Sequence, residues 1–284
     1  MAVEMQQAEL AGLDALELHA VGGPSPWARL WSSMWPKAAA AALALVLWQA
    51  VAWSGWKPSY VLPGPGPVLG ELRRLVLQAD FWEAVTRTLQ RAAIGYAVAV
   101  VVGVVVGVVV ARFRYLRVAV GAMITGVQTM PSIAWFPLAI LLFQLSESAI
   151  LFVVVLGAAP SVANGLIGGV DHVPPLLLRA GRTLGAKGLT LYRHVILPAS
   201  LPSFLAGLKQ GWAFAWRSLM AGELLVVIEG RPSIGASLQF ARELSDTPGL
   251  LAYMIVLLVL GVTADALFGW LDTGVRRRWG LLDR

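Results

Sequence analysis

Side chains that could perform catalysis or bind a metal are scarce in this sequence of 284 residues. The absence of cysteine excludes disulfides, thiolate metal ligands and a cysteine nucleophile. The three histidines, His19, His172 and His194, lie too far apart along the chain to match the ligand spacing of a metal site. We therefore expect no catalytic residue, no metal and no cofactor.

Two segments approach known catalytic motifs without completing them. The segment from Gly181 to Lys187 has the wrong spacing for a phosphate-binding loop. The segment Gly235–Gln239 begins like a nucleophile elbow but lacks its last glycine. Because no histidine lies in an apolar segment to act as a base, we expect neither an enzyme nor an ATPase site in this chain.

The remaining candidates are polar side chains inside apolar segments. Arg217 lies about 15 residues into such a segment, and an ionisable residue within a membrane helix indicates function by default. It could contact an anionic substrate, or it could be a structural charge paired with Glu223 or with backbone carbonyls. Four residues of neighbouring segments could line the path of a transported solute, or could instead form hydrogen bonds between helices. They are Gln128, Ser132, Trp135 and Asn164.

The composition indicates that membrane helices position these residues. The chain is 58% hydrophobic and only 13% charged, whereas soluble domains carry about 25% charged residues. At about 20 residues per span, we predict an all-α polytopic membrane protein with six transmembrane helices. Residues 1–35 are expected to be a flexible cytoplasmic tail, and residues 36–284 the transmembrane domain. The predicted spans are about 38–53, 92–111, 118–143, 149–168, 202–227 and 250–270.

Two of these spans have features that predict how they pack. In the second, Gly95, Ala99, Gly103 and Gly107 recur every four residues, which predicts a face that another helix approaches closely. The third is broken at 130–132, where a proline frees a backbone carbonyl that only protein or a watery cavity can satisfy.

The distribution of basic residues predicts the orientation. Of the 22 Lys and Arg residues, 13 fall on the side of the N-terminus, 7 on the other side and 2 within the fifth span. The excess marks the cytoplasmic side, so both termini are expected in the cytoplasm. Basic loops of this kind also account for the net charge of +6 without a nucleic-acid partner.

A polar loop over residues 171–198, between the fourth and fifth spans, is predicted to project into the cytoplasm. Pro174 and Pro175 suit the start of a helix, and Gly185 and Gly188 permit a sharp turn before a second short helix. A helix with an apolar face at this position is suited to docking in a cleft of another protein.

This loop resembles that of permease subunits of bacterial ABC importers, which carry a Glu-Ala-Ala motif, a glycine and an Ile-x-Leu-Pro end. Arg179 stands in place of the family's glutamate, Gly181 in place of its second alanine and Val195 in place of its isoleucine. The resemblance extends over about residues 61–278, and segments 131–141, 215–223 and 234–243 resemble the sulfonate, taurine and nitrate subgroup. It implies that eight residues couple the chain to an ATPase. They are Arg179, Ala180, Gly181, Leu184, Gly185, Val195, Leu197 and Pro198.

The resemblance also implies the partners and the location. It predicts a homodimer in the lipid of the bacterial cytoplasmic (inner) membrane, two ABC ATPase subunits and an extracytoplasmic solute-binding protein. The expected cargo is a small anion, with an aliphatic sulfonate first and taurine or nitrate as alternatives. An ATP-independent secondary transporter or channel is the other class of protein compatible with the composition.

Overall fold

In the computed structural model, which describes residues 26–278, the described chain is helical and contains no strand. The all-α class is therefore confirmed. The chain divides into two compact units, residues 1–66 and residues 67–284, which we describe separately.

The first unit contains helix α2, Pro26–Trp53. Its C-terminal part matches the first predicted span, but residues 26–35, which we expected in the flexible tail, are helical. Proline is well suited to the first position of a helix, and Trp27 and Trp31 continue the helix at a spacing of four residues. The rest of the predicted tail, residues 1–25, lies outside the described residues. The loop after α2 folds back on the helix. There the indole Nε1 of Trp48 donates a hydrogen bond to the Pro63 carbonyl oxygen over 3.0 Å.

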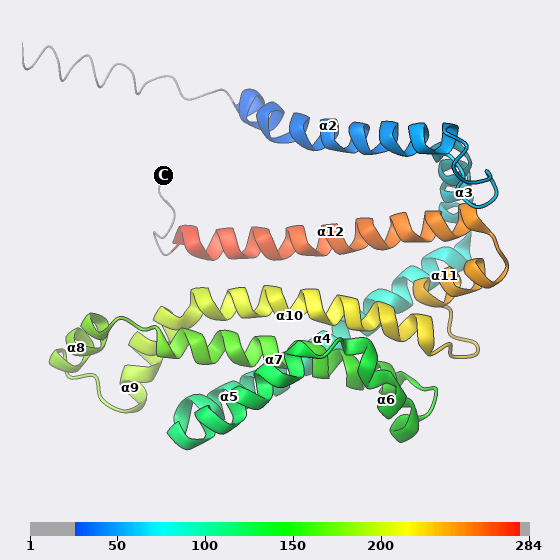
Figure 1. Cartoon of the computed structure of the whole chain (residues 1–284). Coiled ribbons are helices and arrows are strands. Elements are labelled where there is room, and N and C mark those ends of the chain that lie inside the picture. Colours follow the sequence, from blue (N-terminus) through cyan, green and yellow to red (C-terminus); the bar gives the residue numbers. More distant parts are fainter. Residues whose placement is uncertain (1–25, 279–284) are drawn as a thin grey trace, which may run out of the picture. The chain divides into compact units, whose positions relative to one another are not determined.

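The core of the second unit is formed by three long helices (Figure 1): α4, Ala79–Arg112, α7, Glu147–Asp171, and α10, Leu197–Leu225. Helix α4 contains the second predicted span. Helix α10 covers most of the fifth, since it begins five residues before residue 202 and ends two residues before 227. Pro198 fits the first turn of α10, where no backbone donor is needed. The short helix α3, Pro65–Val76, precedes α4.

The predicted small-residue face of α4 packs against α7. Gly95, Ala99, Gly103 and Gly107 are all buried. A Cβ atom added to Gly103 would lie 2.7 Å from both the Ala159 carbonyl oxygen and the Val162 Cβ. The stripe predicted from the sequence is thus a close helix contact, as expected of small residues between membrane helices.

The third predicted span is broken where the sequence indicated. Helix α5, Arg114–Thr129, is followed by the 3-10 turn η1, Ser132–Trp135, and by α6, Phe136–Phe143. The two arms meet at 100°. Met130 is extended, because a residue before proline is driven out of the helical region.

The predicted cytoplasmic loop contains helix α8, Pro175–Thr183, a short turn α9, Leu189–Leu191, and a π-helical turn η2, Tyr192–Ile196, that continues into α10. After α10 come α11, Ile234–Glu243, and α12, Thr247–Arg278, which contains the sixth predicted span. Figure 1 shows α8 and α9 at one end of the three-helix core and α6 and α11 at the other.

By length and hydropathy, four described helices can cross a membrane, and the bent pair of α5 with η1 and α6 is a fifth candidate. The four are within α2, α4, α7 and α12. Helix α10 has 29 residues but carries Lys209, Arg217 and Glu223, which lower its hydropathy. The count of six spans therefore stays a prediction, with α10 as the sixth.

Candidate functional site

A cavity of about 310 Å³ lies at the break between α5 and α6. It is lined by the end of α5, the η1 turn, and residues of α7 and α10. Four of the five residues predicted to line a path meet here: Gln128, Ser132, Trp135 and Arg217. Because the break turns the backbone by 100°, residues from both arms face the same space.

Arg217 brings a positive charge to the wall of this cavity. Its guanidinium lies 5.7 Å from the centre of the Phe214 ring, a cation–π contact. Within residues 26–278, no carboxylate lies within ion-pair distance of it. The predicted alternative, a pair with Glu223, is wrong because Glu223 is bound by Arg91, at 3.0 Å from Nη1 to Oε1.

Gln128 joins the cavity wall to α7 by two hydrogen bonds. Its Nε2 donates to Ser161 Oγ over 2.9 Å, and its Oε1 accepts from Asn164 Nδ2 over 2.9 Å. Asn164, the fifth predicted path residue, does not line the cavity but holds Gln128 in place. Gln128 therefore lines the cavity and also bonds α5 to α7, and its place on a solute path stays a prediction.

A buried charge network lies at the opposite end of α10 from α8. Glu223 is completely buried and accepts hydrogen bonds from the Thr88 hydroxyl, at 2.9 Å, and from the Gly235 backbone N–H, at 3.1 Å. Arg91 links it to Glu147 on α7, with a distance of 2.7 Å between Nη2 and Oε1. Through these bonds, side chains of α4, α7 and α10 meet the start of α11.

Sequence reasoning missed this network, although a signal for it exists. Arg91 directly precedes the second predicted span, and Glu147 lies two residues before the fourth. Glu223 lies near the end of the fifth. In the predicted topology all three therefore fall at the same side of the membrane. Opposite charges at one membrane depth can pair, but which residues pair depends on how the helices pack.

One more ion pair joins long helices of this unit. Lys209 Nζ on α10 lies 3.3 Å from Asp265 Oδ1 on α12. Asp265 is therefore a paired residue.

The eight residues predicted to couple the chain to an ATPase lie in or around α8. Gly181 is buried where α8 meets η2, and an added Cβ atom would lie 2.9 Å from Val195 Cγ2. Ala180 and Arg179 belong to the same helix, and Leu197 and Pro198 begin α10. Gly185, two residues after the end of α8, lies in the left-handed region with φ of +86°, where glycine is unstrained.

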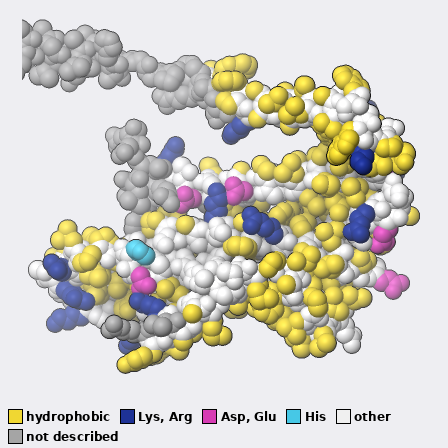
Figure 2. All heavy atoms as spheres, viewed as in Figure 1, with side chains coloured by type: hydrophobic (Ala, Val, Ile, Leu, Met, Phe, Trp, Pro, Cys, Tyr) yellow, Lys and Arg dark blue, Asp and Glu magenta, His cyan; other side chains and the backbone are white. Residues whose placement is uncertain are grey.

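The surface of α8 combines apolar and basic side chains. Leu184 is 87% exposed and Leu176 is 75% exposed. Figure 2 shows Lys and Arg side chains gathered at this end of the molecule. A small apolar cluster, formed by Val173, Leu191 and Ile196, packs α8 against the ends of α7 and α10.

A helical bundle with apolar helices, a cavity with polar side chains at a broken span and an exposed helix at one end is compatible with a transport permease. Residues 99–277 match the family model described as "Binding-protein-dependent transport system inner membrane component". The match covers more than half of the chain, and the chain belongs to this family.

Curated relatives and a solved structure agree with this assignment. The chain is 31% identical over 221 residues to SsuC of Escherichia coli, named as an aliphatic sulfonates transport permease, covering 78% of this chain and 83% of SsuC. It is 33% identical over 232 residues to the riboflavin transport system permease RibX of Chloroflexus aurantiacus, covering 81% and 85%. An inward-facing structure of the MetNI methionine ABC transporter has a similar fold, with a TM-score of 0.57, 19% identity, and coverage of 74% of this chain and 98% of that chain.

Proposed function

We propose that this permease carries a small anion across the inner membrane, with an aliphatic sulfonate as the first candidate and taurine or nitrate as alternatives. In this proposal two copies of the chain form the path, an external binding protein delivers the solute, and two ATPase subunits drive transport. The termini face the cytoplasm. The observation that carries the proposal is the guanidinium of Arg217 at the wall of a polar cavity, without a carboxylate partner in residues 26–278.

The chemistry of the cavity wall favours an anion over a neutral solute. Sulfonate oxygens accept hydrogen bonds only, and the wall offers them a guanidinium, an amide and a hydroxyl donor. Charge-assisted bonds to a guanidinium are about twice as strong as neutral ones. The hydroxyl is that of Ser132, beside the Gln128 amide, because the Thr129 hydroxyl donates to the Gly126 carbonyl oxygen over 2.7 Å. The name of SsuC supports a sulfonate, whereas the name of RibX makes riboflavin the competitor to include in any test.

The proposal assigns ATPase docking to α8. Its exposed leucines provide an apolar contact surface, and Gly181 packs closely against Val195 of η2. Movement of α8 would therefore be passed to the two long helices that flank this segment, α7 and α10.

Replacing Arg217 with glutamine tests the anion site. We expect ATP-dependent uptake of an alkanesulfonate into proteoliposomes to fall about tenfold, because one charge-assisted bond contributes about 1.5–3 kcal/mol and 1.4 kcal/mol is a factor of ten. The proteoliposomes contain the chain, its ATPase and its binding protein, and the panel of solutes includes taurine, nitrate and riboflavin. Arg217→Lys keeps the charge and should retain more uptake.

Two outcomes would contradict this assignment. Unchanged sulfonate uptake by Arg217→Gln, with the complex assembled, would leave Arg217 a structural residue. Uptake by the unmodified protein in the absence of ATP would instead favour the ATP-independent transporter or channel.

Replacing Gly185 with tryptophan tests the docking surface. The positive φ strains any L-residue there, and the indole would stand on the proposed contact surface, so we expect the ATPase to be lost on co-purification. Gly230→Trp is the matched control, because Gly230 has φ of +69° and equally open surroundings at the far end of the core. Normal ATPase retention by Gly185→Trp would rule out this surface.

A further inference from the structure

Helix α5 is attached to α7 by polar contacts at both of its ends. At the C-terminal end of α5, Gln128 bonds to Ser161 and Asn164 of α7 beside the polar cavity. At the N-terminal end of α5, Arg117 Nη1 lies 2.5 Å from Oδ1 of Asp171, the last residue of α7. The same guanidinium donates from Nη2 to the Ala111 carbonyl oxygen of α4 over 2.8 Å.

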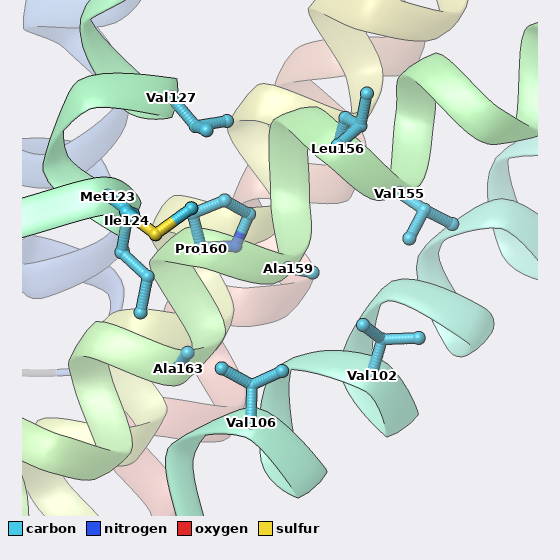
Figure 3. A pocket seen from close by; sticks show the side chains of 10 residues that line it. All are labelled: Val102, Val106, Met123, Ile124, Val127, Val155, Leu156, Ala159, Pro160 and Ala163. Atoms are coloured by element: carbon cyan, nitrogen blue, oxygen red, sulfur yellow. The ribbon is translucent and has the colours of Figure 1, made fainter. Parts of the chain in front are cut away.

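Between these two attachments the contact of α5 is apolar and uneven, since Ile124 is 7% exposed whereas Met123 is 69% exposed. An apolar cavity of about 210 Å³ separates the middle of α5 from α4 and α7. Figure 3 shows Met123 and Ile124 of α5 facing Val106 of α4 and Pro160 of α7 across it. Side chains that line a cavity make fewer dispersion contacts on that side, so the polar contacts at the two ends add to the attachment of α5.

The Arg117–Asp171 attachment adjoins α8, the proposed ATPase-docking helix. Only residues 172–174 separate Asp171 from α8. Val173, within this connection, is buried with Leu191 and Ile196. The short connection and its buried valine give movement of α8 a direct route to the end of α7 that holds Asp171.

We propose that the Arg117–Asp171 ion pair transmits movement of α8 to α5, and through α5 to the polar cavity. The two residues act as positioning residues, because neither touches the cavity that Gln128 lines. The inference rests on the proposed function, in which α8 binds the ATPase. It predicts that ATP hydrolysis and transport can be separated by a change that leaves α8 itself intact.

Replacing Asp171 with asparagine tests the link. We expect the variant to retain its ATPase subunits on co-purification and to hydrolyse ATP, while sulfonate uptake falls at least fivefold. Asp171→Glu keeps the charge and should restore most of the uptake. Arg112→Gln is the control. Arg112 is an exposed basic residue at the end of α4, five residues before Arg117, and has no ion-pair partner within residues 26–278.

A second measurement follows the movement of α5 directly. Because the chain lacks cysteine, the single change Ala122→Cys gives one labelling site on the exposed side of α5. A nitroxide there should change its spectrum when ATP and vanadate are added to the assembled complex, and Asp171→Asn should abolish this change. A structural role alone would leave the ATP-dependent change in place.

The outcomes separate this inference from the function on which it rests. An Asp171→Asn variant that binds the ATPase and shows normal uptake or a normal label response overturns the link alone. Failure of the unmodified chain to bind any ATPase overturns the proposed function, and the link with it.

Discussion

Replacing Glu223 with alanine is expected to lower the free energy of unfolding by about 3–5 kcal/mol, the usual effect of removing one partner of a buried ion pair. The change leaves Arg91 with Glu147 as its remaining carboxylate. It also removes the acceptor of the Thr88 hydroxyl and of the Gly235 N–H. A buried donor without a partner costs about 1–3 kcal/mol.

This effect is measured by chemical unfolding of the purified protein in detergent. Glu229→Ala is the matched control, since Glu229 is exposed six residues further along the chain, and its change should be within about 0.5 kcal/mol. Glu223→Gln should fall between the two, because the amide keeps an acceptor oxygen but loses the charge. Equal stability of the two alanine variants would show that the network contributes little.

Replacing Gly165 with alanine is expected to destabilise the contact between α7 and α10 by about 1–3 kcal/mol, the usual range for an overpacked core. An added Cβ atom would lie 2.6 Å from the Cα of Gly207, so one backbone must move away from the other. The movement would also stretch the hydrogen bond from Ser203 Oγ to the Gly165 carbonyl oxygen, now 3.1 Å long.

Gly168→Ala supplies the comparison on the same helix. There an added Cβ would lie 3.7 Å from Ser203 Oγ, an ordinary contact, and alanine favours a helix over glycine by about 1 kcal/mol. Thermal unfolding should therefore separate the two variants, with Gly165→Ala less stable and Gly168→Ala equal to or above the unmodified protein. The opposite order would mean that the two helices are not in close contact at Gly165.

The sequence predicted most of the helices because their signals are local. The four-residue period of small residues after Gly95 predicted the face that packs on α7. Pro131 predicted the break at the polar cavity, because the proline ring excludes a regular helix whatever surrounds it. Helix α11 was not predicted as a helix, since its ten residues lack a long apolar run.

The candidate site was predicted less completely. Gln128, Ser132 and Arg217 were chosen as polar residues in apolar segments, and the structure brings them to one cavity. One alternative for Arg217, a pair with Glu223, was wrong because proximity along one helix says little about partners. Glu223 is only six residues from Arg217, yet its carboxylate is bound by residues of α4 and α11.

The sequence by itself determined the class of the protein, its long helices and the broken span. It also determined the helix with an apolar face, α8, in the loop over residues 171–198. These depend on composition, on prolines and on periods of a few residues, all of which act within one segment. Only the tertiary structure decided the partners of the charges: Arg91 with Glu147 and Glu223, and Arg117 with Asp171. The reason is physical, since a charge in a membrane helix pairs with whichever opposite charge packing brings within a few ångströms, and that distance is set by the contacts of every helix in the bundle.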